Sequence, residues 1–122
     1  MRPRTLRKYV NPKGYILVLE EDPLIRPLLE RWLGEAGYQV TAPSGTGEPK
    51  PALVIADVPD PQSAEALVRS LPEYAALLLS ARFRRGLAGS AEAARRLGVK
   101  KVLPKPFTRK EPLAAVHEAL EP

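Results

Sequence analysis

The sequence predicts an α/β fold in which helices flank a doubly wound, five-stranded parallel sheet. Short apolar runs alternate along the chain with segments whose apolar residues recur at helical spacing. Runs that are apolar throughout are typical of parallel strands buried on both faces. A polar residue directly follows four of these runs: Glu20 after Leu19, Asp57 after Ala56, Ser80 after Leu79 and Lys105 after Pro104. The chain has 122 residues, which suits a single domain.

Strands are expected where short runs rich in apolar or β-branched residues are bounded by turn-forming residues, at 15–19, 38–41, 53–56, 76–79 and 101–103. Helices are expected between and after them, at about 23–36, 63–71, 90–97 and 109–120. Asp22 is a favourable N-cap for the first helix, and Pro23 suits its first position. Gly37 and Gly98 are typical residues for ending a helix.

The segment between the second and third strands breaks this alternation. Residues 43–51 contain three prolines and two glycines, without any apolar periodicity. Because proline and glycine disfavour a helix interior, we expect a loop where an alternating fold would place its second helix. One face of the sheet should then be thinly covered near the second strand.

The net charge of +5 comes from the start of the chain. Residues 1–14 carry five basic side chains and no acidic one, whereas the remainder is formally neutral. We therefore predict a basic N-terminal tail over 1–14 and one domain over 15–122. A solvated leader is the favoured interpretation of the tail, and contact with nucleic acid or an acidic partner is the alternative. Nucleic-acid binding by the domain itself is not predicted.

Two absences narrow the class of protein. The chain has no cysteine, which excludes disulfides and thiolate metal sites and fits a cytoplasmic location. No apolar run approaches the roughly 18 residues that a membrane span requires. We expect no contact with a membrane.

The polar residues at the strand ends are the best indication of function. In a doubly wound sheet the carboxyl ends of the strands lie at one edge, where such folds place their ligand sites. We therefore expect one acidic pocket built from Glu20, Glu21, Asp57, Ser80 and Lys105. Taken singly, each has an ordinary interpretation as a helix-start acid, a turn residue or a surface lysine. Their joint placement favours the pocket.

Four segments of the chain, taken together in their sequence order, resemble those of a response-regulator receiver domain of two-component signalling. They are residues 16–23, the strand ending at Asp57, the Leu79-Ser80-Ala81 step and Lys105-Pro106-Phe107. The resemblance extends over about residues 15–120 and implies a flavodoxin-like fold. It also implies a protein that is not an enzyme, beyond its own phosphorylation and dephosphorylation.

The resemblance assigns a role to each residue of the pocket. Asp57 would accept a phosphoryl group from a histidine kinase or a phosphotransfer protein. Glu20 and Glu21 would hold Mg²⁺ together with Asp57, since Mg²⁺ prefers oxygen ligands. Lys105 would offset the negative charge brought together during transfer, and Ser80 would donate a hydrogen bond to the phosphoryl group.

The resemblance also implies a downstream partner protein. Only two residues follow Leu120, so we expect a separate protein to carry the response. The family uses the face of the fourth helix, fifth strand and fifth helix for partners. On that face this chain offers small and basic groups that suit a homodimer or an acidic partner: Ala91, Ala94, Val99 and Lys101.

Several departures from the family pattern point to a trimmed, atypical single-domain member. Both acidic positions after the first strand are Glu, where at least one Asp is more usual. Val102 stands where the family has its aromatic switch residue, and the second helix is missing.

Two functions therefore compete. One is a phosphoacceptor in a phosphorelay, and the alternative is a pseudo-receiver that acts as a protein-protein interaction module without phosphorylation.

Two enzymatic alternatives have less support. A metal-dependent nuclease site would need an acid two residues after Asp57, where the chain has Pro59. A small-molecule hydrolase would need a Gly-x-Ser-x-Gly elbow, which the sequence lacks. His117 has no second His or Cys to join it in a metal site, and we expect it to face solvent.

Overall fold

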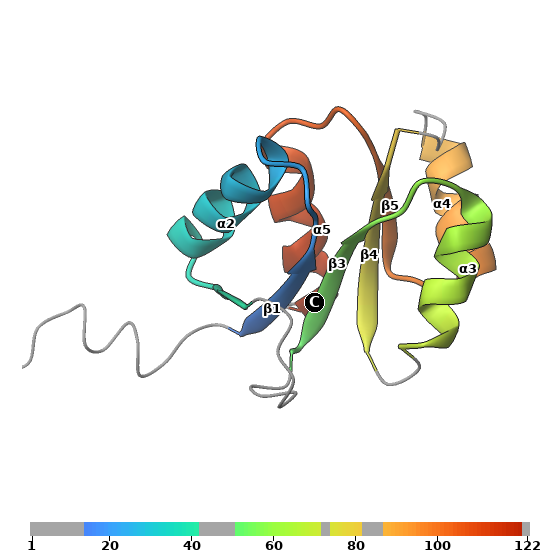
Figure 1. Cartoon of the computed structure of the whole chain (residues 1–122), viewed down its shortest axis with the longest axis horizontal. Coiled ribbons are helices and arrows are strands. Elements are labelled where there is room, and N and C mark those ends of the chain that lie inside the picture. Colours follow the sequence, from blue (N-terminus) through green and yellow to red (C-terminus); the bar gives the residue numbers. More distant parts are fainter. Residues whose placement is uncertain (1–13, 42–50, 72–73, 82–86, 121–122) are drawn as a thin grey trace, which may run out of the picture.

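The computed structural model describes residues 14–41, 51–71, 74–81 and 87–120 of the chain. Within these ranges a helix follows each strand except β2, after which the described chain continues with β3 (Figure 1). The elements are β1 Tyr15–Leu19, α2 Ile25–Glu35, β2 Gln39–Thr41, β3 Leu53–Asp57, α3 Pro61–Arg69, β4 Ala75–Ser80, α4 Leu87–Leu97, β5 Lys101–Pro104 and α5 Lys110–Leu120. The predicted α/β class and the five predicted strands are confirmed.

All five strands are parallel and lie in the order β2-β1-β3-β4-β5. The chain therefore moves outward from β1 to β2, returns past β1 to β3, and continues outward to β5. This is the doubly wound, flavodoxin-like order that places ligands at the carboxyl ends of the strands. The flavodoxin-like prediction is confirmed.

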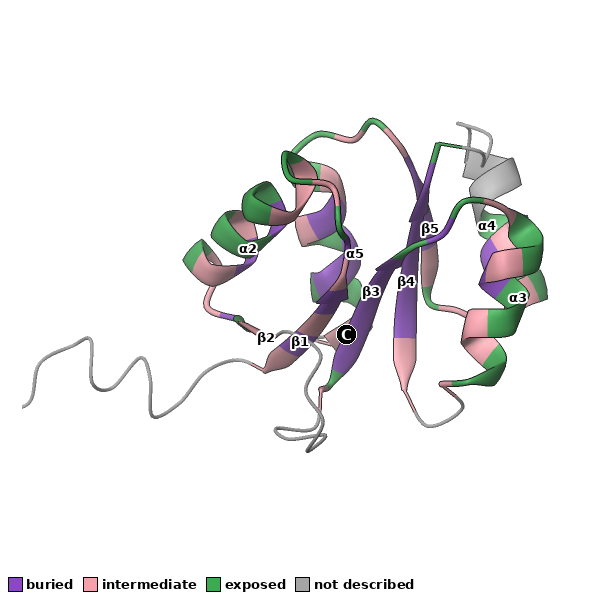
Figure 2. Ribbon diagram, viewed as in Figure 1, coloured by how far each residue is buried: buried purple, intermediate pink, exposed green. Residues whose placement is uncertain are grey.

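Helices cover both faces of the sheet. In Figure 1, α2 and α5 lie on one side of the strands, and α3 and α4 lie on the other. Alternate residues of one strand face opposite layers, so Leu53 and Ile55 pack toward α2 and α5, while Val54 and Ala56 pack toward α3 and α4. Figure 2 shows the consequence, since the central strands β3 and β4 are buried along almost their whole length.

Two helices begin earlier than the sequence patterns indicated. Helix α3 begins at Pro61 instead of residue 63, because the Asp60 side chain accepts a hydrogen bond from the backbone of Ser63 at 2.8 Å. Asp60-Pro61 is thus an N-cap residue followed by a proline in the first helical position, and this pattern could have been identified in the sequence. Helix α4 begins at Leu87, three residues before the Ser90 start that was predicted.

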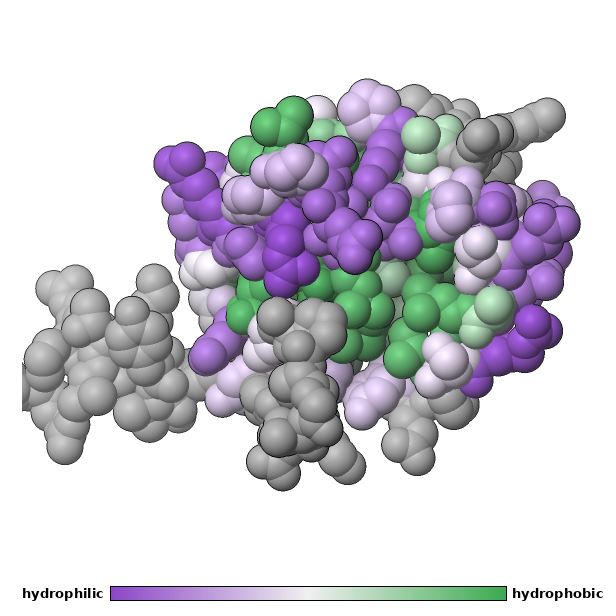
Figure 3. All heavy atoms as spheres, viewed as in Figure 1, coloured by the Kyte–Doolittle hydropathy of each residue, from purple (hydrophilic) through white to green (hydrophobic). Residues whose placement is uncertain are grey.

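The loop predicted over 43–51 lies mostly outside the described residues, which resume at residue 51. The thin cover predicted beside it can be examined on β1. Ile16 and Val18 are fully buried against α2 and α5, whereas Leu17 and Leu19, on the opposite face, are partly exposed. Figure 3 shows apolar side chains reaching the surface over β1 and β3, between α2 and α3. At β1, the face of the sheet that packs toward α3 and α4 is therefore less well covered than the face that packs toward α2 and α5.

None of the helices that the structure describes is long and apolar enough to cross a membrane.

Truncation of a central core side chain tests this packing. Leu77 in β4 is fully buried, so Leu77→Ala should lower the free energy of unfolding by about 2–5 kcal/mol. Leu24 is 77% exposed, and Leu24→Ala should change it by less than about 0.5 kcal/mol. Urea denaturation of both variants measures the difference, and equal losses would contradict the described core.

Candidate functional site: an acidic pocket at the carboxyl edge of the sheet

The four strand ends meet at one edge, as predicted. Glu20 follows β1, Asp57 ends β3, Ser80 ends β4 and Lys105 follows β5. A cavity of about 430 Å³ opens there and is lined by Val18, Leu19, Glu20, Glu21, Asp22, Arg26, Asp57 and Lys105. The structure thus brings Glu20, Glu21, Asp57 and Lys105 to a single cavity.

The centre of the site is the ammonium group of Lys105. Its Nζ lies 2.7 Å from Oε1 of Glu20 and 2.8 Å from Oδ1 of Asp57. The backbone N–H of Lys105 donates to the carbonyl of Ser80 at 3.0 Å, so a hydrogen bond to the end of β4 fixes the backbone position of Lys105. One cation therefore links side chains from the ends of β1 and β3.

The two carboxylates differ in how far water reaches them. The Glu20 side chain is 2% exposed and that of Asp57 is 36% exposed. Oε2 of Glu20 accepts the backbone N–H of Asp22 at 3.2 Å, while Oε1 contacts Lys105 as an ion pair without an aligned hydrogen bond. Glu20 is a buried charge that needs a cation, whereas Asp57 remains accessible to an incoming group.

Burial and the two carboxylates act on the pKa of Lys105 in opposite directions. Burial lowers this pKa, but the contacts with Asp57 and Glu20 outweigh burial and hold the pKa above its ordinary value of 10.5. Because the pKa is raised on folding, the contribution of Lys105 to stability is intact at neutral pH and up to about 10.5. It is lost as the pH rises through the higher pKa of the folded state.

Asp22 belongs to the helix start and lies at the rim of the pocket. Its Oδ1 accepts the backbone N–H groups of Leu24 at 2.7 Å and Ile25 at 3.2 Å, so Asp22 stabilises the turn that leads into α2. The helix itself begins at Ile25, two residues after the predicted Pro23. These two hydrogen bonds lower the pKa of Asp22 below its ordinary value, the one from Leu24 contributing most. The carboxylate of Asp22 therefore stabilises the backbone at the start of α2.

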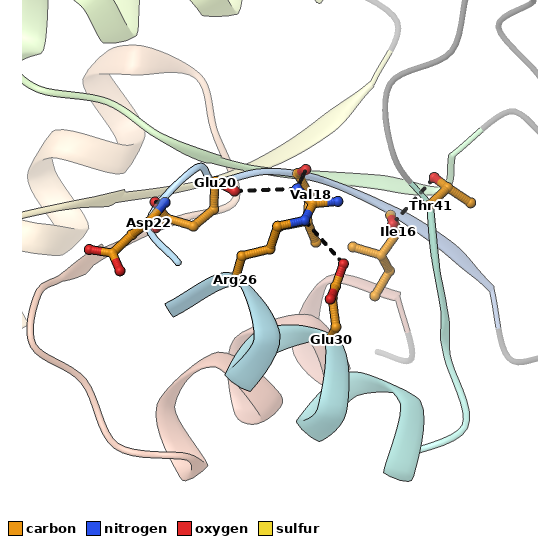
Figure 4. A network of polar contacts seen from close by, with 7 residues as sticks. All are labelled: Ile16, Val18, Glu20, Asp22, Arg26, Glu30 and Thr41. Carbon is orange, nitrogen blue, oxygen red and sulfur yellow. Dashed lines mark hydrogen bonds and ion pairs between the residues drawn. The ribbon is translucent and has the colours of Figure 1, made fainter. Parts of the chain in front are cut away.

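Arg26 is a pocket residue that the sequence patterns did not reveal. Its Nη1 donates to the carbonyl of Val18 at 2.9 Å and to that of Glu20 at 3.3 Å, and its Nε donates to Glu30 at 3.1 Å. Figure 4 shows the side chain running from α2 toward the end of β1. The Arg26–Glu30 spacing of four residues was visible in the sequence, but the contacts with β1 arise from the tertiary fold.

The carboxylates of the pocket are the type of donor that a hard divalent cation prefers. Glu20 and Asp57 offer carboxylate oxygens to the same point, and Mg²⁺ is commonly held by one or two carboxylates together with waters. Among the described residues, no three His, Cys, Asp or Glu side chains are arranged to hold a metal ion. Glu21 lines the cavity but is exposed, so its place in the ligand set stays a prediction.

The remaining predicted residues fall in three different settings. The Ser80 side chain is buried and is not part of the cavity lining, so its role toward a phosphoryl group stays a prediction. Val102 is fully buried in the core cluster beneath α3 and α4. His117 is exposed, as expected.

The predicted partner surface forms a second cavity. Ala91, Ala94, Val99 and Lys101, all predicted for that surface, line it together with Arg95, Lys100 and Glu118, and its volume is about 370 Å³. Three of these seven side chains are basic and one is acidic, so the cavity has a net positive lining.

Removal of the central cation tests the electrostatic account of the pocket. Lys105→Met leaves the buried Glu20 without its counter-charge and should lower the free energy of unfolding by about 2–4 kcal/mol. Arg31→Met breaks an exposed ion pair with Glu35 and should cost at most about 0.5 kcal/mol. Urea denaturation in metal-free buffer compares them, and a Lys105→Met protein as stable as Arg31→Met would refute the account.

Comparison of the sequence with models of known protein families finds no match, and comparison with curated proteins finds none. Solved structures do match. The non-phosphorylated receiver domain of HemR from Leptospira biflexa is 24% identical, with a TM-score of 0.66 over 92% of this chain and 96% of that one. The chemotaxis response regulator CheY4 of Vibrio cholerae is 17% identical, with a TM-score of 0.66 over 88% and 98%. The BeF3-activated receiver domain of DrrB is 23% identical, with a TM-score of 0.63 over 89% and 98%. Across most of its length this chain has the fold of response-regulator receiver domains.

Proposed function

We propose that this protein acts as a receiver in a cytoplasmic two-component phosphorelay and that it accepts a phosphoryl group on Asp57. The observation that carries the proposal is the convergence of Glu20, Asp57 and Lys105 at the carboxyl edge of a receiver fold. Asp57 is the exposed end of an otherwise buried strand, so a donor can reach its carboxylate from solvent.

The reaction is a transfer between the donor and a carboxylate oxygen of Asp57. A bond forms from that oxygen to phosphorus while the bond from phosphorus to the donor atom breaks, and the donor leaves with the electron pair. Bringing an anionic carboxylate to a phosphoryl group opposes like charges, and the ammonium of Lys105 offsets part of this repulsion. Glu20, Asp57 and Glu21 are the residues that would hold Mg²⁺, and the ion would supply further positive charge against this repulsion when bound.

The donor in the relay would be a histidine kinase or a phosphotransfer protein. Two exposed apolar side chains beside the pocket suit docking of such a protein near Asp57. Leu24, directly before α2, is 77% exposed and Leu28, in α2, is 43% exposed, and these two are the large apolar side chains left exposed in the described part of the chain. An apolar contact there would bring the donor's phosphoryl group toward the cavity mouth.

Treatment with acetyl phosphate tests the acceptor directly. In the presence of Mg²⁺, intact mass spectrometry should show a gain of one phosphoryl group, and Asp57→Asn should abolish it. Asp60→Asn is a suitable control, because Asn caps a helix as well as Asp and preserves the start of α3. The control should gain the group as the native protein does. An equal gain in Asp57→Asn would place the acceptor elsewhere.

The output would be read through the α4–β5–α5 surface. The basic lining of its cavity favours an acidic segment of a partner protein, and a second copy of the chain is the alternative occupant. Arg95 and Lys101 contribute two of the positive charges.

Charge reversal at this surface should abolish partner binding. The double variant Arg95→Glu, Lys101→Glu should lose proteins that the tagged native chain retains from its own cell extract. A control with the same change of charge, Arg31→Glu with Arg69→Glu, should retain them. Sedimentation velocity reports whether self-association changes too. Retention of the same partners by all three proteins would refute the assignment.

One observation favours the alternative, a pseudo-receiver that binds partners without phosphorylation. Val102 is fully buried in the core at the position where the resemblance places an aromatic switch residue, so no aromatic side chain there can turn inward in response to a phosphoryl group. If the alternative holds, Asp57→Asn will bind its partner as the native protein does, and acetyl phosphate will leave that binding unchanged.

A further inference from the structure

Strand β1 extends past the end of its edge neighbour, β2. In the described chain, the pairing of β1 with β2 ends at Leu17, whereas its pairing with β3 continues to Leu19. The last residues of β1 therefore have a strand partner on one side only in this part of the chain. The pocket begins at this half-paired end, because Glu20 follows it directly.

The carbonyl groups on the β2 side of β1 form one row, because alternate carbonyls of a strand point the same way. The Gly14 carbonyl accepts a backbone N–H from β2 at 2.8 Å, and the Ile16 carbonyl accepts the hydroxyl of Thr41 at 3.5 Å. The carbonyls of Val18 and Glu20 come next in this row, beyond the end of β2. Both residues are buried, and a carbonyl that water cannot reach is unfavourable without a donor.

Arg26 supplies donors to both of these carbonyls. Its Nη1 donates to the carbonyl of Val18 at 2.9 Å and to that of Glu20 at 3.3 Å. Figure 4 shows the guanidinium beside Val18, next along β1 from the contact with β2. Its Nε donates to Glu30, one turn further along α2, at 3.1 Å, which fixes the direction of the planar group. A side chain of α2 thus continues the edge of the sheet where the strand stops.

We infer that Arg26 is a positioning residue of the pocket, which takes the place of further residues of β2 and sets the direction in which Glu20 presents its carboxylate to a divalent ion. This inference rests on the proposed function, because it takes the pocket to be the metal site. Arg26 holds the backbone end of Glu20, while Lys105 contacts the carboxylate end at 2.7 Å. Residues that orient a metal ligand commonly change the metal affinity by roughly 10–100-fold.

The guanidinium has a geometry that an ammonium group does not reproduce. Its N–H groups point in fixed directions within one plane, so Nη1 and Nε together reach two carbonyls and a carboxylate. Arg26→Lys keeps the charge and removes this geometry. Arg31→Lys is the matched control, because Arg31 also lies on α2 and its Nε donates to Glu35, four residues along, at 3.4 Å. Arg31 does not line the pocket.

NMR of the metal-free protein tests the positioning itself. In Arg26→Lys the ¹³C resonances of the Val18 and Glu20 carbonyls should shift, because they lose their donor. The ¹⁵N resonance of the Lys105 ammonium should shift too, because the carboxylate of Glu20 changes direction. Arg31→Lys should leave these resonances as they are in the native protein. Shifted carbonyls with an unchanged Lys105 resonance would make Arg26 a support of β1 alone and would overturn the inference.

Metal affinity gives a second measurement. By isothermal titration, Arg26→Lys should bind Mg²⁺ about tenfold more weakly than the native protein. Arg31→Lys should change the affinity less than about twofold. With acetyl phosphate, the Mg²⁺ concentration for half-maximal phosphorylation of Arg26→Lys should rise by the same factor as the dissociation constant, and the rate at saturating Mg²⁺ should stay within about twofold. Partial unfolding would lower the saturating rate instead.

Circular dichroism establishes that each variant is folded. If Arg26→Lys is not, Glu30→Ala replaces it. This variant keeps the guanidinium and removes the partner that orients it, on a residue that is 43% exposed. It should shift the same carbonyl and ammonium resonances in the same directions and weaken Mg²⁺ binding.

The outcomes separate this inference from the proposed function. A shifted Lys105 resonance supports the positioning of Glu20, and does so even if the native protein binds no Mg²⁺, a result that would count against metal-dependent phosphorylation. Binding of Mg²⁺ with equal affinity by the native protein and Arg26→Lys overturns the inference and leaves the proposed function standing. An equal loss of affinity in Arg31→Lys also overturns it, because the effect would then come from α2 in general.

Discussion

A buried carboxylate that needs a cation is the constraint on which the site depends. Glu20 leaves β1 at the carboxyl edge of the sheet with almost no access to water, and the ammonium of Lys105 meets it at 2.7 Å. The same ammonium reaches Asp57, which is open to solvent at the end of β3. Two strand ends are thereby held by one charge, and any chemistry at Asp57 takes place beside it. A phosphoryl group or a divalent ion entering the pocket must change how these three charges are shared.

The fold supplies this arrangement through its apolar core. Parallel pairing of β1, β3, β4 and β5 brings four carboxyl ends to one edge, and two layers of helices bury the strands behind it. The N–H of Lys105 bonds to Ser80 at the end of β4, while Arg26 ties the start of α2 to the carbonyls at the end of β1. The backbone of Lys105 and the end of β1 are thus held by hydrogen bonds to backbone carbonyls in addition to the ion pairs in the pocket.

The strands and the pocket were predictable because each rests on a local pattern. Uniformly apolar runs indicated buried parallel strands, and the polar residue after each run had to lie at the shared edge. The start of α3 was missed although Asp60-Pro61 carried the signal, and α4 begins before Ser90, which resembles a cap. Contacts that depend on tertiary geometry could not be predicted. The ion pair of Lys105 with Glu20 joins residues 85 positions apart, and Arg26 reaches β1 across a helix-to-strand contact that no spacing reveals. Glu21 is the same type of residue as Glu20 but is exposed, because the side chains of successive residues point in different directions at the end of a strand.

The most direct test of the account is an NMR titration of the protein with Mg²⁺ and then with beryllofluoride, which mimics a phosphoryl group on a carboxylate. If the carboxyl edge is a cation-assisted phosphoacceptor site, the backbone amide signals at the ends of β1, β3, β4 and β5 will shift, and those of β2 will not. The same titration of Asp57→Asn should show no response to beryllofluoride. Shifts in that variant equal to those of the native protein, or no shifts at the strand ends of the native protein, would contradict the account.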